Sequence, residues 1–329
     1  MKIAIVILNW NGEKLLEQFL PSVIACSKIA DIYIADNAST DNSIEFIKSK
    51  YPEVNIIQNK TNGGYAKGYN DALKYVDADI YCLLNSDVEV SENWLEPITD
   101  VFQNNKAAIV QPKILDYKNQ EYFEYAGAGG GFIDAFGYPY CRGRIFNTIE
   151  KDNGQYNDIK EIFWASGACF FIRKQVFEEL GGFDEDYFAH QEEIDLCWRA
   201  KNNGYQIFYV GLSAVYHVGG ATLSNTSPKK TFFNFRNSLF TLLKNLPKQK
   251  IIPIVLSRLF LDAIASFKFL LEFKFAFFLA IIKAHFSFYY YFLKIFKKRS
   301  KKVLKTKYYL ITSVVWVYFV DNKKHYRDL

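Results

Sequence analysis

The first hundred residues alternate short apolar runs with longer segments of helical periodicity. The runs at 2–8, 32–35, 54–58 and 80–84 predict buried strands, and the stretches at 13–26, 43–51 and 66–75 predict helices between them. Strands and helices that alternate in this way form a mainly parallel sheet with right-handed crossovers. We therefore expect an α/β fold.

Polar residues follow three of these predicted strands. They occupy 9–11, 36–41 and 85–87. In open α/β sheets, ligands bind outside the carboxyl ends of the strands. Three coincidences of this kind predict a ligand crevice at that edge.

Composition indicates a folded chain in a reducing compartment. Half of the 329 residues are apolar, and the five cysteines are scattered without a CxxC pair. This pattern argues against a disulfide framework and a structural zinc site. The opening MKIAIVILNW is interrupted by Asn9 and Asn11, so we interpret it as a first strand rather than a signal peptide.

The later part of the chain changes character twice. Residues 116–160 are rich in glycine and aromatics and predict loops with short strands. A second segment runs from 161 to about 245, with strands near 162–163 and 169–172 and a helix near 193–203. We expect one domain over 1–245, divided near residue 115, and a separate C-terminal region over 246–329.

The C-terminal region is strongly basic. Residues 246–329 hold 17 Lys and Arg against 4 Asp and Glu, which leaves 23 basic and 31 acidic residues in 1–245. Such a region is suited to an anionic surface. An acidic first part that binds an anionic ligand needs a cation.

The same region predicts an amphipathic helix. Arg258, Asp262, Lys268 and Glu272 fall on one face, and Leu, Ile, Phe and Ala fill the rest. An aromatic band then runs into a dense basic cluster at 283–307. We expect this region to lie in a membrane interface. The alternative is a helical subdomain packed on the core with a solvated basic run.

Asp87 and His217 are candidate metal ligands. Asp87 follows an apolar strand in LLNSD, where a carboxylate can hold Mg²⁺ or Mn²⁺ against a diphosphate. The alternative for Asp87 is a helix N-cap. His217 follows another apolar strand, and a structural role is its alternative.

A second group of residues is a candidate for binding a nucleoside. Asp36 can accept bonds from a ribose or a base N–H, or it can form an Asx turn. The segment 62–70, NGGYAKGYN, offers glycines that permit close approach to a ligand, with Tyr65 and Asn70 beside them. A plain turn into a helix is the alternative.

Glu192, Glu193 and Asp195 form a carboxylate cluster at a predicted helix start. One of them can act as a general base toward an acceptor hydroxyl. The alternative is that they complement the helix dipole. Neither a GxGxxG fingerprint nor a P-loop follows the first strand, and GxSxG and HExxH are absent from the sequence.

The ordered set of these segments resembles the family-2 glycosyltransferases with a GT-A fold, particularly the bacterial rhamnosyltransferase-like branch. The matching segments, which cover about residues 3–240, are VILNWNG, IADNASTDNS, NGGYAKGYN, LLNSD, ASGACFFIRK, GGFDEDYFAHQEEIDLCWR, VYHVGGAT and FRNSL. The hydrophobic, basic tail is similar to the tails of such enzymes, although this match is looser.

The resemblance implies a role for each matched position. Nucleotide binding falls on Leu8, Asn9, Asn11, Asp36, Asn62, Gly63, Tyr65, Gly68, Asn70, Asn85 and Ser86. The metal falls on Asp87 of a DxD-like motif and on His217. The base falls on the Glu192–Glu193 pair, with Asp195 in reserve. The acceptor sugar falls on Trp164, as a stacking platform, with Ser166, Gly167 and Ala168.

Two positions depart from the family pattern. Asn85 replaces the first Asp of DxD, and Glu193 stands where Asp is commoner. The implied reaction is an inverting transfer from dTDP-rhamnose or a UDP-hexose to a glycan acceptor, with Mg²⁺ or Mn²⁺ as cofactor. The expected partners are a lipid-linked acceptor and an anionic membrane surface at the cytoplasmic face of the bacterial inner membrane, and no nucleic acid.

Three other functions are alternatives to a glycosyltransferase. A sugar nucleotidyltransferase would need a glycine- and basic-rich loop after the first strand, which ILNWNGEK does not supply. A non-catalytic protein that binds nucleotide sugars or glycans is the main alternative. A purely structural membrane-surface protein would bind no nucleotide.

Overall fold

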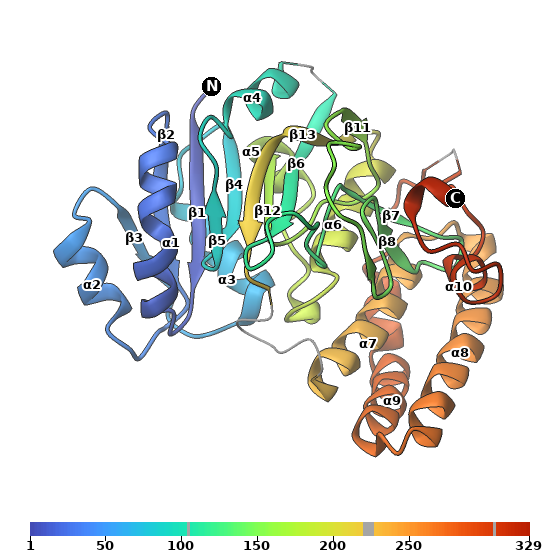
Figure 1. Cartoon of the computed structure of the whole chain (residues 1–329). Helices are drawn as coiled ribbons and strands as arrows, with labels where there is room; N and C mark the ends of the chain where they lie inside the picture. Colours follow the sequence, from blue (N-terminus) through green and yellow to red (C-terminus); the bar gives the residue numbers. More distant parts are fainter. Residues whose placement is uncertain (104–105, 220–226, 305–306) are drawn as a thin grey trace.

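The structure is a computed structural model that describes residues 1–103, 106–219, 227–304 and 307–329 (Figure 1). Among these residues, the central sheet has nine strands in the order β11-β13-β6-β12-β4-β1-β2-β3, with β5 paired to β13. The strands are β1 (Ile3–Asn9), β2 (Ala30–Asp36), β3 (Asn55–Gln58), β4 (Ile80–Asn85), β5 (Val88–Val90), β6 (Ala107–Asp116), β11 (Ile159–Glu161), β12 (Cys169–Arg173) and β13 (Gln206–His217).

Most of the long strands point the same way. β1 pairs in parallel with β2 and β4, β2 with β3, and β6 with β13. β12 is antiparallel to both β4 and β6, so those two share a direction. This confirms the expected α/β fold with a mainly parallel sheet. Because β12 is reversed, the residues before it lie at the edge where the parallel strands end.

Helices cover both faces of the sheet. α1 (Glu13–Cys26), α2 (Ser43–Lys50) and α4 (Glu96–Phe102) pack on one face, and α3 (Gly64–Ala72), α5 (Lys174–Glu179) and α6 (Glu192–Asn202) on the other. β1 shows why both faces are covered, because its side chains alternate between the two cores. Ile3, Ile5 and Ile7 enter one core, and Ala4 and Val6 enter the other.

The sequence pattern did not predict strand β6. Its central residues Gln111, Pro112 and Lys113 interrupt the apolar run, yet all of β6 up to Leu115 is buried. Pro112 pairs with Val210, where the register of β13 shifts before Ala214. A proline is tolerated inside a sheet at such a bulge, because no regular ladder bond is required of it.

A smaller sheet follows β6, as expected for the glycine-rich segment. Its four strands are β7 (Gly131–Ile133), β8 (Pro139–Cys141), β9 (Arg144–Ile145) and β10 (Thr148–Ile149). An isolated bridge between Gly131 and Trp164 joins it to the main body. This sheet supports both the segment before β12 and the C-terminal helices.

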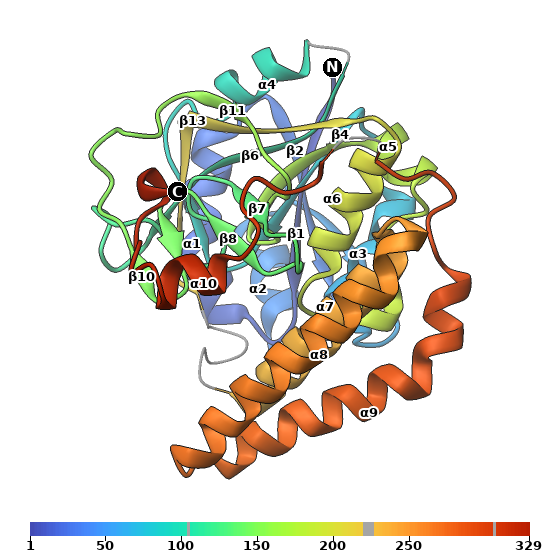
Figure 2. The ribbon, with the colours of Figure 1, turned by 90° about the vertical axis from the view of Figure 1, so that its right-hand side faces the viewer.

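The C-terminal helices are α7 (Pro228–Asn245), α8 (Lys248–Leu271), α9 (Phe275–Lys297) and the short α10 (Val314–Phe319). α8 and α9 form a hairpin that projects from the α/β body (Figure 2). α7 packs against α6 and also against α9. The domain boundary predicted at residue 245 falls between α7 and α8, and it stays a prediction.

The hairpin buries an ion pair among apolar side chains and exposes large apolar side chains on its outside. Arg258 Nε donates to Asp262 Oδ1 at 3.0 Å, and the Tyr138 hydroxyl donates to the same oxygen at 3.1 Å. Both members of the ion pair are buried. The predicted polar face of α8 therefore points into the protein over these two residues, and Lys268 and Glu272 remain exposed near the hairpin turn.

Candidate active site

Asp36 ends β2 and is buried, with both carboxylate oxygens in hydrogen bonds. Asn9 Nδ2, at the end of β1, donates to Asp36 Oδ1 at 3.1 Å, and the Ser39 N–H donates to Oδ2 at 3.0 Å. Asn11 Oδ1 accepts from the Thr40 N–H at 2.7 Å. These bonds hold the loops after β1 and β2 together at the predicted edge. The bond to Ser39 also gives Asp36 the turn-forming role that was its alternative.

The segment 62–70 lies against these loops. Asn37 Nδ2 donates to Asn62 Oδ1 at 3.0 Å and to the Gly64 carbonyl at 3.1 Å. Gly63 precedes α3 as its N-cap, and Gly68 lies in the first turns of that helix. A Cβ on Gly68 would come within 2.8 Å of Leu8 Cδ1. Leu8, Asn62 and Gly68 are thus brought together, and Gly68 has no room for a side chain.

Tyr65 and Asn70 point away from Asp36. The Tyr65 hydroxyl donates to the Gly167 carbonyl at 2.8 Å. Asn70 Nδ2 donates to the Phe183 carbonyl and its Oδ1 accepts from the Phe183 N–H, both at 2.9 Å. Because the Asn70 amide is bonded in both directions, its structural role replaces the predicted nucleotide contact. Tyr65 instead connects this segment to Gly167, just before β12.

Asp87 and His217 meet at the same edge. His217 Nε2 lies 3.2 Å from Asp87 Oδ1, and His217 Nδ1 lies 3.4 Å from Glu124 Oε2. Asn85 Nδ2 is 3.4 Å from His217 Nε2, and Ser86 Oγ is 3.8 Å from where a Cβ on Gly12 would stand. Asp87 precedes β5, so it does not cap a helix.

The surroundings of His217 fit a divalent cation. Burial alone lowers the pKa of His217, but the hydrogen bonds and charges of Asp87 and Glu124 outweigh it and raise the pKa to about 10. The imidazole is therefore a cation between two carboxylates, and a metal bound at Nε2 would take the place of its proton. A carboxylate behind the imidazole is the usual partner of a metal-binding histidine. Two protein ligands suffice when substrate phosphates and water complete the shell. Among the described residues, no cluster of three His, Cys, Asp or Glu side chains offers a closed metal cage.

Glu192 and Glu193 begin α6 beside Gly167. Glu192 is buried, and its Oε2 has no hydrogen-bond partner among the described residues. Burial, together with the charge of Glu193, raises the pKa of Glu192 well above its usual range. Burial raises the pKa of Glu193 to about 7, although backbone hydrogen bonds oppose the shift. A carboxyl with a pKa near neutrality is suited to general base chemistry.

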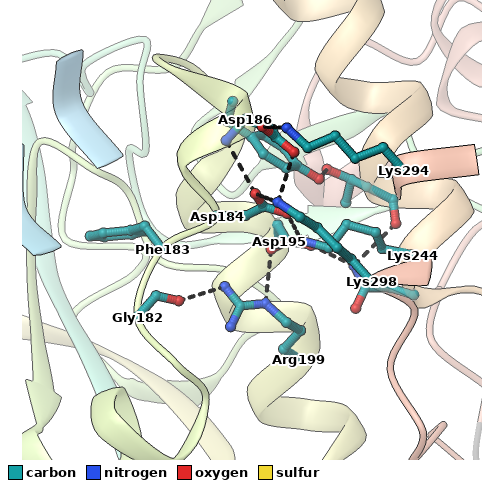
Figure 3. Close-up of polar contacts among 12 residues, drawn as sticks. Gly182, Phe183, Asp184, Asp186, Asp195, Arg199, Lys244, Lys294 and Lys298 are labelled. Atoms are coloured by element: carbon teal, nitrogen blue, oxygen red, sulfur yellow. Dashed lines mark hydrogen bonds and ion pairs between the residues drawn. The ribbon is translucent and has the colours of Figure 1, made fainter. Parts of the chain in front are cut away.

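Asp195 has a different environment from its neighbours (Figure 3). Its carboxylate accepts bonds from Lys244 Nζ and Arg199 Nε, each at 2.8 Å, and from Asn245 Nδ2 at 2.8 Å. Burial opposes ionisation here, but Lys244 and Arg199 outweigh it and lower the pKa of Asp195. A fully bonded carboxylate with a lowered pKa is a poor base, so Asp195 is not retained as a catalytic candidate.

The segment before β12 lies beside the start of α6. A Cβ on Gly167 would lie 3.8 Å from Glu193 Cδ. Ser166 N–H donates to Gln111 Oε1 at 2.8 Å, and Ser166 Oγ accepts from the Ala168 N–H at 3.2 Å. The Ala168 carbonyl accepts from the Asn85 N–H at 2.9 Å. These bonds hold Ala168 at the end of β4, two residues before Asp87, and leave Gly167 next to Glu193.

Trp164 cannot provide the predicted stacking platform. Its ring is buried, and its Nε1 donates to the Phe132 carbonyl at 2.9 Å. A Cβ on Gly131 would come within 2.1 Å of the ring. The indole is thus packed beneath β7. The family resemblance implied a sugar contact for Trp164, but here Gly131 makes room for the buried ring.

Sequence reasoning missed three residues of this region. Glu124 faces His217 Nδ1, Asn37 bonds the segment 62–70, and Gln111 orients Ser166. Glu124 lies in the glycine-rich excursion, where no strand pattern marks it. Part of the predicted VYHVGGAT motif, residues 220–222, lies outside the described residues.

An α/β sheet with a polar edge of this kind is typical of nucleotide-binding enzymes. The structure is similar to a solved complex of GalNAc-T7 with UDP, GalNAc and Mn²⁺, with a TM-score of 0.60 and 18% identity over 76% of this chain and 49% of that one. A sequence model of glycosyl transferase family 2 matches residues 4–181. The chain belongs to glycosyl transferase family 2, as predicted.

Two curated relatives extend this comparison. The N-acetylglucosaminyl-diphospho-decaprenol L-rhamnosyltransferase of Mycobacterium tuberculosis is 25% identical over 65% of this chain and 75% of its own length. It agrees with the predicted rhamnosyltransferase-like branch. A low-salt glycan biosynthesis hexosyltransferase of Haloferax volcanii is 23% identical over 62% of this chain. The match spans 63% of the Haloferax protein.

Proposed function

We propose that this chain is an inverting glycosyltransferase. It transfers a sugar from a nucleotide diphosphate sugar, dTDP-rhamnose or a UDP-hexose, to a hydroxyl group of a glycan acceptor in cell-surface polysaccharide synthesis. The observation that carries the proposal is the bond from Asn85 to Ala168. It joins the strand end before Asp87 to the segment in which Gly167 lies next to Glu193. A cation site and a base with a raised pKa are the two groups that such a transfer needs.

The donor occupies the edge formed by the ends of β1, β2 and β4. The loop 36–39 and the segment 62–68 form the nucleoside side, and Gly68 lets the segment pack closely on Leu8. Asp87 and His217 hold Mg²⁺ or Mn²⁺, with Glu124 orienting the imidazole. When bound, the cation neutralises charge on the diphosphate leaving group. The Mn²⁺ and UDP in the GalNAc-T7 complex support this assignment.

Glu193 acts on the acceptor. Its carboxylate takes the proton of the acceptor hydroxyl, whose oxygen attacks the anomeric carbon from the face opposite the diphosphate. The new carbon–oxygen bond forms as the bond to the diphosphate breaks, and the nucleoside diphosphate leaves with that electron pair. Glu192 remains protonated beside Glu193 because burial and the neighbouring charge disfavour a second carboxylate. Only one glutamate of the pair therefore serves as the base.

The acceptor is a lipid-linked saccharide, and the protein works on a membrane surface. The mycobacterial relative is named for a decaprenyl diphosphate acceptor. The hairpin of α8 and α9 exposes large apolar side chains along both helices: Ile252, Leu256, Phe260, Ile264, Phe267, Leu271, Phe275, Leu279, Phe286, Tyr290 and Leu293. Trp316 and Phe319 of α10 are exposed as well. Apolar surface of this extent marks an interaction site.

The hairpin lies in one leaflet. Among the described residues, α9 is long and apolar enough to cross a bilayer by length and composition alone. However, Ala284 and Phe288 of α9 are buried, and α9 packs against α7 and α8. Lys294 near the end of α9 also pairs with Asp186 of the α/β body at 2.6 Å. We therefore place the protein peripherally on the cytoplasmic face of the bacterial inner membrane, with the exposed lysines near anionic headgroups.

The test is thermal unfolding with UDP, dTDP, GDP and CDP, each with and without Mn²⁺, on wild type and Asp87→Ala. A ligand at 100 times its Kd stabilises a fold by about 2.7 kcal/mol. We expect one nucleotide to raise the Tm only with metal, and Asp87→Ala to abolish that shift. Asp31→Asn, at the opposite end of β2, is the matched control.

A second step separates turnover from binding. The nucleotide that raises the Tm identifies the donor to use in a transfer assay with a lipid-linked acceptor. Transfer that Glu193→Gln abolishes, while nucleotide binding persists, supports the proposal. Binding without any transfer by wild type would favour a non-catalytic binding protein, and no shift with any nucleotide would refute the donor site.

A further inference from the structure

The segment between the η2 turn (Glu185–Tyr187) and α6 has a strained backbone. Phe188, His190 and Gln191 have φ angles of 64°, 68° and 72°. Residues with a Cβ rarely adopt this left-handed region, and such strain persists only when surrounding contacts enforce it. Gln191 is also the N-cap of α6, and its side chain makes no capping bond. An interaction other than a side-chain cap must therefore hold the backbone in the position where α6 begins.

Asn237 of α7 supplies that constraint. Its Nδ2 donates to the carbonyl oxygens of Tyr187, Ala189 and His190 at 3.1, 2.9 and 2.7 Å. The Asn237 side chain is fully buried. The amide group of one side chain thus forms hydrogen bonds with three backbone carbonyls of the strained segment. Buried carbonyls that lost these bonds would each carry a desolvation cost.

Arg236 orients this amide. Arg236 Nε donates to Asn237 Oδ1 at 2.9 Å, which leaves Nδ2 facing the strained segment. Arg236 Nη2 also donates to the Asp186 and Tyr187 carbonyls at 3.0 and 3.1 Å. The neighbouring pair in FRNSL therefore acts as one clamp on residues 186–190.

The clamped segment contacts both halves of the candidate site. The Phe188 carbonyl accepts from the Tyr65 N–H at 3.0 Å, at the start of the segment 64–70. Gly64 has a φ of 78°, and a Cβ there would come within 2.4 Å of the Phe188 carbonyl oxygen. At its other end the segment continues directly into Glu192 and Glu193. The position of this segment therefore determines how far the candidate base, Glu193, lies from the donor side.

We propose that Arg236 and Asn237 are positioning residues for sugar transfer, which hold the segment 188–191 in its strained form so that Glu193 faces the acceptor. This inference rests on the proposed function, because it takes Glu193 as the base. Neither residue needs to touch substrate. Their effect is on the placement of the carboxylate, and a displacement of about 1 Å can cost about 100-fold in rate.

The decisive variant is Asn237→Asp, which keeps the shape of the side chain but removes the donating NH₂ group. We expect kcat to fall about 100-fold, because the Glu193 carboxylate is displaced. The donor KM should rise by a smaller factor, because the same segment also bonds the Tyr65 amide on the donor side. The pH profile of kcat/KM should also shift, since a displaced Glu193 has a different environment. Arg236→Lys, which keeps the charge but loses the Nε bond to Asn237, should give a smaller loss in the same direction.

Lys294→Met is the matched control. It removes another contact between the C-terminal helices and this region, the ion pair with the Asp186 side chain (Figure 3). The hydrogen bonds from Arg236 and Asn237 to the backbone carbonyls do not involve Lys294. We expect its kcat and pH profile to match those of wild type. A wild-type kcat for both Asn237→Asp and Arg236→Lys, with only a lowered Tm, would show a merely structural clamp and overturn the inference.

Amide hydrogen exchange gives a readout that does not depend on turnover. Asn237→Asp should raise the exchange rates of residues 188–193 and of the Tyr65 amide at least about tenfold, and Lys294→Met should not. Unchanged exchange in Asn237→Asp would overturn the clamp even in a protein without measurable transfer. Failure of the proposed function alone would instead appear as faster exchange in Asn237→Asp with no transfer by wild type.

Discussion

The backbone N–H of Asn85 donates to the carbonyl oxygen of Ala168 at 2.9 Å. This bond joins the end of β4 to the residue before β12. Asp87 follows on one side of it and Gly167 precedes on the other, so the proposed cation site and the proposed acceptor side are joined through this one bond. The bond exists because β12 runs antiparallel to β4 and starts where β4 ends.

Removal of the carboxylate behind His217 should weaken metal binding. Glu124 Oε2 lies 3.4 Å from His217 Nδ1 and fixes the orientation of the ring. Loss of such a partner typically costs 10- to 100-fold in metal affinity. We expect Glu124→Gln to need about 10–100 times more Mn²⁺ for the same nucleotide-dependent rise in Tm. The exposed Glu121→Gln serves as control, and equal Mn²⁺ requirements in both variants would contradict the assignment.

The activity should depend on the ionisation of Glu193. Its pKa is raised to about 7, and a base must be deprotonated to accept a proton. We therefore expect kcat/KM to rise with pH up to about 7 and then to level off. Each pH unit below the pKa should cost about tenfold. A flat profile between pH 5 and 8, measured with chemistry rate-limiting, would exclude Glu193 as the base.

The stability of the protein should fall when one partner of the buried Arg258–Asp262 pair is removed. Asp262→Ala leaves the Arg258 guanidinium buried without its counter-ion, and also removes the partner of the Tyr138 hydroxyl. Breaking a buried pair in this way costs about 3–5 kcal/mol. Urea unfolding should show this loss. The double variant Arg258→Met/Asp262→Leu should recover most of it, and a double variant as unstable as Asp262→Ala would argue against the pair as the cause.

The apolar exterior of the hairpin should drive membrane binding. Burial of a phenylalanine side chain contributes about 1.5–3 kcal/mol, so Phe260→Lys should weaken binding to anionic vesicles by about tenfold or more. Phe286→Lys should act in the same direction from α9. Leu212→Lys replaces an exposed apolar side chain on β13, far from the hairpin in sequence, and should bind as wild type does. Co-sedimentation measures all three, and equal binding would refute the proposed surface.

Much of the donor side could be predicted from local sequence. Apolar runs that end in polar residues specify strands whose carboxyl ends share one edge. Asn9, Asp36 and His217 were therefore placed correctly at that edge before any contact was known. Helix α6, with two glutamates at its start, was also predicted within a few residues.

Contacts between distant segments could not be predicted in this way. The sequence pattern does not distinguish Asp195 from Glu193. In the structure, Lys244 and Arg199 form ion pairs with Asp195. Burial instead raises the pKa of Glu193. Trp164 was expected to stack on a sugar, but its ring is buried against β7 and cannot reach one. Glu124 had no local signal at all.

The sequence by itself determined the strand and helix periods, the polar edge of the sheet and an amphipathic, basic C-terminal region. These depend on residue spacing along one element, which hydrophobic patterning specifies directly. Only the tertiary structure decided which carboxylate is available as a base, and that Arg258 and Asp262 turn inward and leave the apolar side of the hairpin exposed. Burial and ion pairing depend on partners far along the chain, and these set the ionisation and exposure of a side chain.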